Sequence, residues 1–164
     1  MSKLHLVTAF AVGSLLLSQA SATAAGAEFP GKGDKKDWVR AAKIYDQALS
    51  QRKRGNIDRA MKMYEEAISI YPYDADFYYN LAINYNRDKK DYKHAQELMA
   101  KAVELKPQSY SMQWEYAAAL LAQGKIEDAK GVLEKAKSLK KTPEQETELK
   151  ETMTKIAAAE KEAK

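Results

Sequence analysis

The side chains that most often carry out catalysis or bind metals are scarce in this sequence. Its 164 residues include no cysteine and only two histidines, His5 and His94. Without cysteine, thiol catalysis, disulfides and cysteine-based metal sites are excluded. His94 has no second histidine or cysteine in the folded part of the chain with which to build a triad or a metal site. The sequence therefore predicts no metal, no cofactor and no catalytic residue.

The acidic residues do not suggest catalysis either. They alternate with lysine, as in EEA, VELK and LEKAK, which is typical of ion pairs on helix surfaces. No glycine-rich phosphate loop or nucleophile elbow occurs. We therefore expect a protein that is not an enzyme. Its formal net charge of +4 is too mild to indicate a nucleic-acid partner. Residues 32–54 hold eight Lys or Arg against three Asp, which indicates a solvated helix face, with a preference for acidic partners as the alternative.

The N-terminus has the three parts of a secretory signal peptide. A short basic start is followed by the apolar run LVTAFAVGSLLL and by the small-residue tract SQASATAAGA. The run has 12 residues, fewer than the roughly 20 that span a membrane. We predict cleavage after Ala22, with Ala24 and Ala27 as other sites and an uncleaved anchor as the alternative. No cysteine is present for a lipid anchor, so we expect a periplasmic or secreted protein without an integral membrane span after cleavage.

The rest of the chain repeats itself. Three sets of residues recur with spacings of 35 and 34: Ala60, Ala95 and Ala129; Tyr64, Met99 and Leu133; Ala67, Ala102 and Ala136. Pro72 and Pro107 are 35 residues apart. Apolar residues at i, i+3/i+4 and i+7 indicate two amphipathic helices in each unit. Between the helices of the middle unit, residues 86–91 contain one extra residue.

This period and order of residues resemble the tetratricopeptide-repeat (TPR) family. The resemblance covers about residues 41–141 and implies an all-α, right-handed TPR solenoid of three helix-turn-helix repeats with a C-terminal capping helix. We expect a signal peptide in residues 1–22, a flexible leader in 23–36, repeats in about 37–74, 75–109 and 110–141, and a capping helix and tail in 142–164. One repeat cannot bury its apolar face alone, so neighbouring repeats supply the core.

Turn and cap residues set the expected helix ends. Gly55 and Gly124 suit the left-handed position that ends a helix. N-caps are predicted at Asn56, Asp74, Asp91 and Ser109. Trp38 is expected to cover the first repeat, where Gln47 and Gln51 replace apolar residues.

The last helix is predicted from a capping box. Thr142 and Gln145 form this box, with Pro143 at the first helical position. The helix should run to about residue 159 with Leu149, Met153, Ile156 and Ala157 on one face. A partly disordered charged tail is the alternative.

The resemblance also implies a binding face. In TPR proteins, set positions of the first helix of each repeat line a concave groove. These positions, with the neighbouring sixth position, select Tyr45, Leu49, Arg52, Tyr79, Asn80, Ile83, Arg87 and Trp114. Aromatic and arginine side chains are common anchors of protein interfaces. The alternative is that the aromatic rings pack between repeats.

One family role is not expected. Co-chaperones of the family hold a C-terminal carboxylate with a Lys, Asn and Arg clamp, of which this chain matches only Asn80. Glu115, at another clamp position, would repel a carboxylate.

We therefore predict a non-catalytic scaffold that binds a protein or peptide segment with acidic and apolar residues, in envelope complex assembly. The alternative is a structural or self-associating envelope protein, with a homo-oligomer as its form.

Overall fold

The computed structural model describes residues 28–162, with side chains through residue 158. Seven α-helices and one π-helix make up its regular structure in this range. They are α2 (Lys35–Lys53), α3 (Ile57–Ile70), α4 (Ala75–Asn84), the π-helix η1 (Tyr85–Lys89), α5 (Tyr92–Leu105), α6 (Tyr110–Ala122), α7 (Ile126–Ala136) and α8 (Pro143–Glu162). The predicted all-α fold is confirmed.

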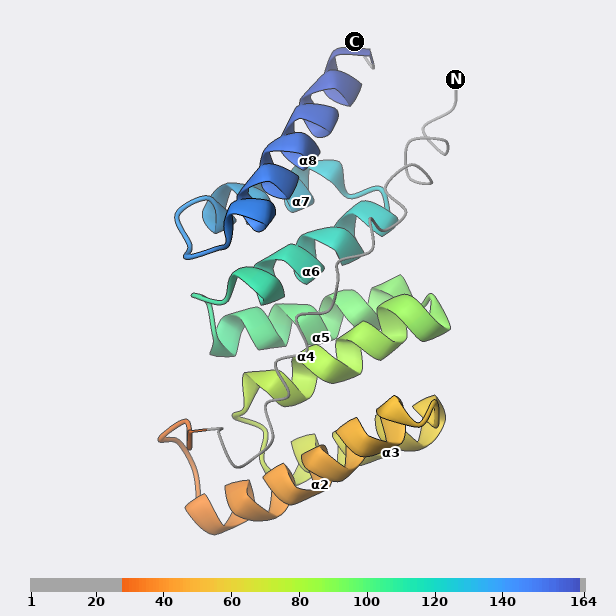
Figure 1. Cartoon of the computed structure of the whole chain (residues 1–164), viewed down its shortest axis with the longest axis vertical. Coiled ribbons are helices and arrows are strands. Elements are labelled where there is room, and N and C mark those ends of the chain that lie inside the picture. Colours follow the sequence, from red (N-terminus) through yellow and green to blue (C-terminus); the bar gives the residue numbers. More distant parts are fainter. Residues whose placement is uncertain (1–27, 163–164) are drawn as a thin grey trace.

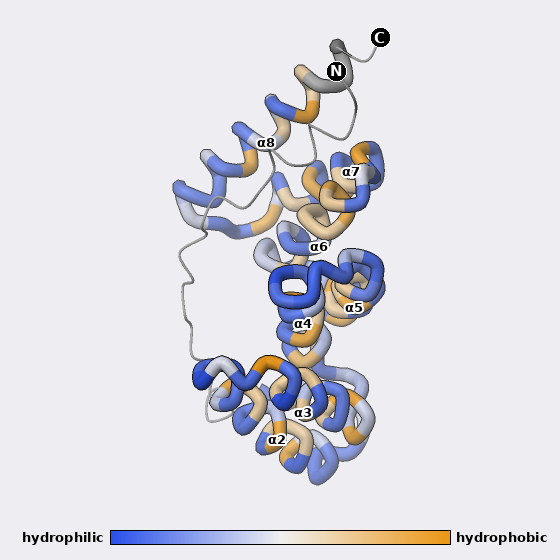
Figure 2. The backbone as a smooth tube through the Cα atoms, turned by 90° about the vertical axis from the view of Figure 1, so that its right-hand side faces the viewer, coloured by the Kyte–Doolittle hydropathy of each residue, from blue (hydrophilic) through white to orange (hydrophobic). Residues whose placement is uncertain are grey.

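The helices stack as three hairpins into an elongated solenoid. α2 pairs with α3, α4 with α5 and α6 with α7, and each hairpin packs on the next (Figure 1). Seen from the side in Figure 2, α4, α6 and α8 lie on one side, and α5 and α7 lie on the other. We call α2, α4, α6 and α8 the first-helix layer and α3, α5 and α7 the second-helix layer. Apolar residues in Figure 2 lie mostly between helices, whereas the turns are hydrophilic.

Small residues allow these helices to approach closely. The six recurring alanines are fully buried: Ala60, Ala67, Ala95, Ala102, Ala129 and Ala136. The bulky residue between them is buried in every repeat, as tyrosine, methionine or leucine: Tyr64, Met99 and Leu133. The residues that recur in the sequence therefore form the core, because each repeat places the same kinds of residue at the same contacts.

The extra residue of the middle repeat is taken up by a π-helix. Gly55 and Gly124 end the turns of the outer repeats at φ +80° and +72°, as predicted. In the middle repeat α4 continues into η1, and the backbone N–H of Asp91 donates to the carbonyl oxygen of Tyr85 at 2.9 Å. A π-turn holds one residue more than an α-turn. Lys90 then takes the left-handed position at φ +56° without being glycine.

All four predicted N-cap residues stand at the N-cap of a helix, and three of them cap it with their side chains. The side chains of Asp74, Asp91 and Ser109 accept hydrogen bonds from the backbone N–H groups of the following helix. Asn56 makes no such bond. Its amide donates instead to Gln51 Oε1 at 2.9 Å, which closes the turn from the preceding helix. Asn56 therefore occupies the predicted N-cap position of α3, but its side chain does not cap the helix.

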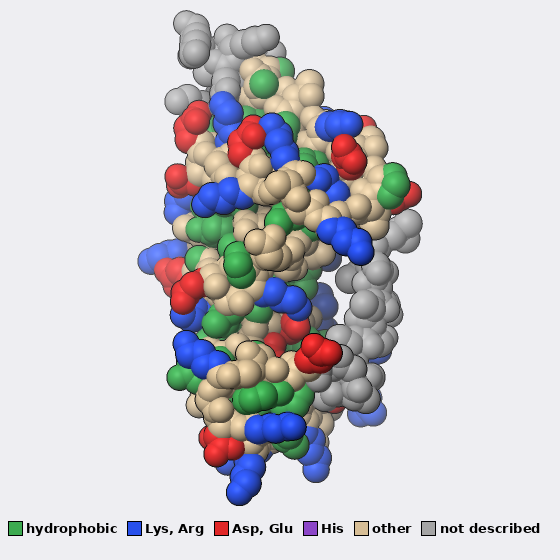
Figure 3. Space-filling view, turned by 90° about the vertical axis from the view of Figure 1, so that its left-hand side faces the viewer, with side chains coloured by type: hydrophobic (Ala, Val, Ile, Leu, Met, Phe, Trp, Pro, Cys, Tyr) green, Lys and Arg blue, Asp and Glu red, His purple; other side chains and the backbone are tan. Residues whose placement is uncertain are grey.

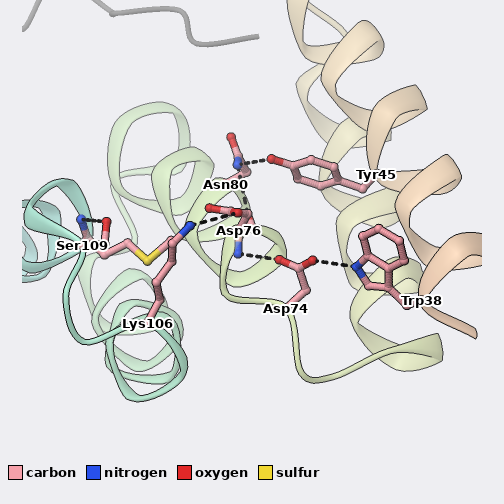
Figure 4. Close-up of polar contacts among 8 residues, drawn as sticks. Trp38, Tyr45, Asp74, Asp76, Asn80, Lys106 and Ser109 are labelled. Carbon is pink, nitrogen blue, oxygen red and sulfur yellow. Dashed lines mark hydrogen bonds and ion pairs between the residues drawn. The ribbon is translucent and has the colours of Figure 1, made fainter. Parts of the chain in front are cut away.

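A buried carboxylate joins the first two repeats (Figure 4). Trp38 Nε1 donates to Asp74 Oδ2 at 3.1 Å, and Asp74 Oδ1 accepts from the backbone N–H of Asp76. Lys106 Nζ lies 3.6 Å from Asp76 Oδ2, so the end of α5 is paired with the start of α4 within the middle repeat. Trp38 is 8% exposed and Asp74 is 7% exposed. Trp38 therefore covers the first repeat with its ring and ties it to the second with its indole N–H.

Residues 28–34, just before α2, lie against the first repeat rather than free of it. Phe29 packs on Trp38 and on Tyr71, with ring centroids 5.7 and 6.1 Å apart. The Tyr71 hydroxyl donates to the Lys32 carbonyl oxygen, and Lys32 Nζ lies 4.6 Å from the centre of the Tyr73 ring. α2 begins at Lys35, inside the leader predicted for residues 23–36. Aromatic contacts thus hold residues that their polar, glycine-containing sequence suggested were flexible.

The last helix begins as predicted. Thr142 and Gln145 form both hydrogen bonds of the capping box, at 2.9 and 3.3 Å. α8 continues three residues beyond the expected end, to Glu162. Leu149 and Ile156 are buried, but Ala157 is exposed, so its predicted place on the packed face is wrong.

The predicted signal peptide, with its cleavage site, and residues 23–27 of the leader lie outside the described residues. Within residues 28–162, no helix has the length and apolar character that crossing a membrane requires.

Candidate protein-binding face

The eight predicted groove residues all lie on the first helices of the repeats or on the π-helix. These positions are Tyr45, Leu49 and Arg52 in α2, Tyr79, Asn80 and Ile83 in α4, Arg87 in η1 and Trp114 in α6. Contacts across helices bring them together from α2 to α6. Packing divides them into buried and accessible residues, and whether they bind a partner stays a prediction.

Tyr45 belongs to the core between the first two repeats. It is 7% exposed, and its ring lies 5.7 Å from that of Tyr64 and 5.0 Å from that of Phe77. Burial is the largest cause of the raised pKa of its hydroxyl. The amide of Asn80 donates to this hydroxyl at 2.7 Å and to the Asp76 carbonyl oxygen at 3.0 Å (Figure 4). Both residues therefore join α2 to α4, and the Asn80 amide has no hydrogen left for a peptide backbone.

The two aliphatic residues also pack inward. Ile83 is 4% exposed and lies in a cluster with Ala82 and Met99. Leu49 is half-buried against the core of the first repeat. The sequence could not distinguish these two packed residues from the accessible groove residues, because all eight predicted positions lie on the same faces of their helices.

An ion pair lies at the centre of the face. Arg87 donates to Glu115 Oε1, joining η1 to α6. The Glu115 side chain is 5% exposed, whereas that of Arg87 is 28% exposed. A nearly buried carboxylate requires a charged or hydrogen-bonding partner. Glu115, from the third repeat, therefore holds the Arg87 guanidinium in place, with its remaining N–H groups at the surface.

Two half-buried aromatic rings flank this ion pair. Tyr79 and Trp114 line one shallow depression with Glu115, and the Trp114 ring stacks on Tyr110 with centroids 6.1 Å apart. Burial, and secondarily the Glu115 carboxylate, raise the pKa of Tyr79 to about 12. The depression has a volume of about 10 Å³, close to that needed for one water molecule. A partner would lie across these rings rather than enter a pocket.

The two ends of the face differ in charge. Arg52 is half-buried near the end of α2. Its positive charge lowers the pKa of the Tyr64 and Tyr79 hydroxyls, whereas burial raises both. At the other end, burial and then the Glu115 and Glu151 carboxylates raise the pKa of Glu148. The face is therefore basic toward α2 and acidic toward α8.

Sequence reasoning missed the part that α8 plays in this face. Gln145 and Glu148 line the same depression as Tyr79 and Trp114. The Tyr110 hydroxyl donates to the Gln145 carbonyl oxygen at 3.0 Å, which holds the start of α8 against α6. The repeat pattern carries no signal for these two residues, because α8 stands outside the repeats.

Possible metal ligands are not clustered in the part of the chain that is described. There, no three or more His, Asp or Glu side chains gather as metal ligands would. His94 Nδ1 lies 2.7 Å from Asp91 Oδ2, and its ring stacks on Tyr85 with centroids 5.2 Å apart.

Solved structures share this fold. The Yersinia enterocolitica type III secretion chaperone SycD, in complex with a peptide of the translocator YopD, matches with a TM-score of 0.69 and 18% identity, over 77% of this chain and 99% of that one. The first TPR domain of human RPAP3 matches with a TM-score of 0.63 and 25% identity, over 74% and 95%. The first TPR of Spaghetti (RPAP3), bound to an HSP90 peptide, matches with a TM-score of 0.65 and 23% identity, over 77% and 94%. No curated protein gives a significant sequence match.

Family models agree with the architecture. Two models described as tetratricopeptide repeat match residues 41–72, in the first hairpin, and residues 86–147, from η1 to the start of α8. The fold class predicted from the period is confirmed by these matches and by the stacked hairpins. The chain belongs to the tetratricopeptide-repeat family.

Proposed function

We propose that this protein is a non-catalytic scaffold that binds a segment of a partner protein across its first-helix layer. The observation that carries the proposal is the central arrangement on this layer: two half-buried rings, Tyr79 and Trp114, beside an arginine held in place by Glu115. Aromatic and arginine side chains contribute much of the binding free energy in protein interfaces. A side chain that is already fixed loses less entropy on binding than a mobile one.

Proteins of the same fold bind peptides. SycD has been solved with a peptide of the translocator YopD, and RPAP3 domains with HSP90 and HSP70 peptides. At 18–22% identity these likenesses bear on the fold, so the partner has to be inferred from the chemistry of this chain. Here the Asn80 amide is occupied and Glu115 stands at the centre, which disfavours a clamp for a C-terminal carboxylate.

The charges of the face suggest how the partner segment lies. Its acidic residues would approach Arg52 and Arg87, its apolar residues would cover Tyr79 and Trp114, and residues without negative charge would face Glu148. Complementary charge also fixes the direction in which a segment binds. The segment would therefore run with its acidic end toward α2.

Site-specific photocrosslinking in cells tests this function. A photoreactive amino acid at Ser111, which is exposed and lines the depression, should capture one main partner. The same amino acid at Glu127, exposed on α7 in the second-helix layer, is the control and should not capture it. The pair Tyr79→Ala and Trp114→Ala should reduce capture at Ser111 at least tenfold.

A second control separates binding from folding. Tyr92→Ala removes a half-buried ring from α5, outside the face, and should leave capture unchanged. Circular dichroism should show the same helix content in every variant. Capture at Ser111 that survives loss of both Tyr79 and Trp114 in a folded protein would rule out this face.

We further propose that the scaffold acts in the cell envelope, in the assembly of a protein complex. Support comes from the three-part N-terminal sequence of residues 1–27. Leu15→Arg within the apolar run should block processing, so that a longer precursor stays in the cytoplasmic fraction, with Ser2→Arg as the matched control. Normal processing and export of Leu15→Arg would contradict this location.

A further inference from the structure

A second concave site lies on the opposite layer. A cavity of about 400 Å³ opens between α3 and α5 above α4. Its apolar residues come one from each of these helices: Ile68, Leu81 and Leu98. This cavity has about forty times the volume of the depression between Tyr79 and Trp114. Figure 3 shows the side of the molecule that is on the left in Figure 1, and hydrophobic side chains are visible between charged ones there too.

Aromatic rings form part of the wall. Tyr85 and His94 stack with centroids 5.2 Å apart and an interplanar angle of 24°. The Tyr85 hydroxyl donates to Glu65 Oε1 at 3.4 Å, so α3 and η1 are joined across the cavity. Tyr78, also in the wall, is held by a hydrogen bond from its hydroxyl to the Pro72 carbonyl oxygen at 3.2 Å. These contacts fix the rings before any ligand arrives.

Two carboxylates in the wall of the cavity lack an ion-pair partner among the described residues. Two exposed carboxylates line it from different helices, Glu65 on α3 and Glu97 on α5, and neither forms an ion pair with another described residue. The lysine and the histidine that also line the cavity already have acidic partners. Lys101 Nζ is bound by both oxygens of Glu104 at 2.8 and 2.9 Å, and the His94 ring is bound by Asp91 at 2.7 Å.

We propose that this cavity is a docking site for an arginine side chain of a partner protein, flanked by apolar residues. A guanidinium is planar and stacks on aromatic rings, and it presents a fork of N–H donors to carboxylates. Its aliphatic stem would pack on Leu81 and Leu98 while the charged head reaches Glu65 and Glu97. A lysine ammonium is more strongly hydrated and lacks the planar surface, so arginine fits better. The site does not depend on binding at the first-helix layer.

Nuclear magnetic resonance with a small probe tests the site directly. Nα-acetyl-arginine amide, titrated into the ¹⁵N-labelled protein, should shift the backbone amides of Tyr85, His94 and Leu98. The matched probe Nα-acetyl-citrulline amide has nearly the same shape but no charge, and its shifts should be at least fivefold smaller. The change Glu65→Gln with Glu97→Gln should reduce the arginine response at least fivefold. Glu66→Gln with Glu127→Gln, an equal change of charge outside the cavity, should leave it intact.

Several results would overturn the proposal. Equal shifts with citrulline, an arginine response unchanged by the Glu65 and Glu97 variants, or shifts confined to α6 and α8 would each exclude an arginine site here. A dimer in light scattering that Glu65→Gln with Glu97→Gln converts to a monomer would assign the cavity to a second copy, which also contradicts the proposal. The changed residues are exposed, and the single variants are available if the double variant unfolds. Photocrosslinking at Ser111 reports on the other layer, so failure of one proposal is distinguishable from failure of the other.

Discussion

Buried charged side chains stabilise a helical stack only where each has partners, and two such residues decide how these repeats meet. Asp74 accepts hydrogen bonds from Trp38 and from the N-terminus of α4. Burial is the main cause of its raised pKa, and both hydrogen bonds oppose that shift. Glu115 is paired by Arg87 across the next interface. The sequence identified Asp74 as an N-cap from its position, but its bond to Trp38 required the tertiary structure.

Replacing Asp74 tests this link. Asp74→Asn keeps one acceptor where the site needs two, so it should lower the free energy of unfolding by about 1–2 kcal/mol, and Asp74→Ala by about 2–3 kcal/mol. Asp37→Asn changes an exposed residue in the first turn of α2 and should cost less than about 0.5 kcal/mol. Urea unfolding followed by tryptophan fluorescence measures all three. An Asp74→Ala variant as stable as the parent would mean that the link contributes nothing.

Glu148 should make stability depend on pH. Its pKa is raised in the folded state by burial and by the Glu115 and Glu151 carboxylates. A raised folded pKa means that stability is present below the unfolded pKa and is lost as the pH rises through the folded one. Glutamine carries no charge, so Glu148→Gln avoids this loss of stability. The variant should have a free energy of unfolding about 0.3–0.5 kcal/mol higher than the parent at pH 7.

Thermal unfolding at several pH values provides the measurement. The advantage of Glu148→Gln should vanish near pH 3, where the parent glutamate is protonated. Glu144→Gln, at an exposed position of the same helix, should show no such gain at pH 7. A gain of equal size at both pH values would point to a cause other than ionisation.

At the scale of single elements, the π-helix shows how far a period can be read. The two small residues of the middle repeat, Ala82 and Ala95, are 13 residues apart, whereas the equivalent distance is 12 in the other repeats. This difference located an extra residue within 86–91, and η1 with the following turn is where it lies. Its form could not be predicted, since an added residue is also accommodated by a longer loop. The structure keeps it helical, and this places Arg87 beside Glu115.

Lys90 should be a weak point of that turn. A left-handed conformation costs about 1 kcal/mol for a residue with a side chain, and the two equivalent positions are glycine. Lys90→Gly should therefore raise the free energy of unfolding by about 0.5–1 kcal/mol, as measured in urea. Lys93→Gly, in the first turn of α5, is the control and should lower it by about 0.5–1 kcal/mol. Destabilisation by Lys90→Gly would show that the lysine makes a compensating contact.

At the scale of the whole molecule, α8 closes one end of the stack. Leu149 and Ile156 are 3% and 2% exposed, and they pack in the cluster that contains Tyr110, Leu120 and Leu121. A solenoid is stabilised mainly by contacts between neighbouring units. Loss of the closing helix should therefore affect the third repeat first.

Core truncation in α8 tests this order. Leu149→Ala and Ile156→Ala should each cost about 2–4 kcal/mol. Hydrogen exchange should then speed up in α6, α7 and α8 before it does in α2 and α3. Ala157→Ser, at an exposed position of the same helix, should change neither measurement. Uniform loss of protection along the chain would show that the stack unfolds as a single unit.

The amino-acid sequence by itself determined the class, number and order of these helices. It could do so because the recurring alanines and their bulky neighbours make contacts that depend on spacing along one chain. It also selected the positions of the predicted groove, but not their exposure. Tyr45 and Ile83 occupy positions equivalent to those of the more accessible Trp114 and Leu49, and only the neighbouring helices decide which are buried. The ion pair of Arg87 with Glu115, the share of α8 in the face and the cavity between α3 and α5 were likewise decided by tertiary structure. Each depends on side chains from different helices, whose distances no repeat period contains.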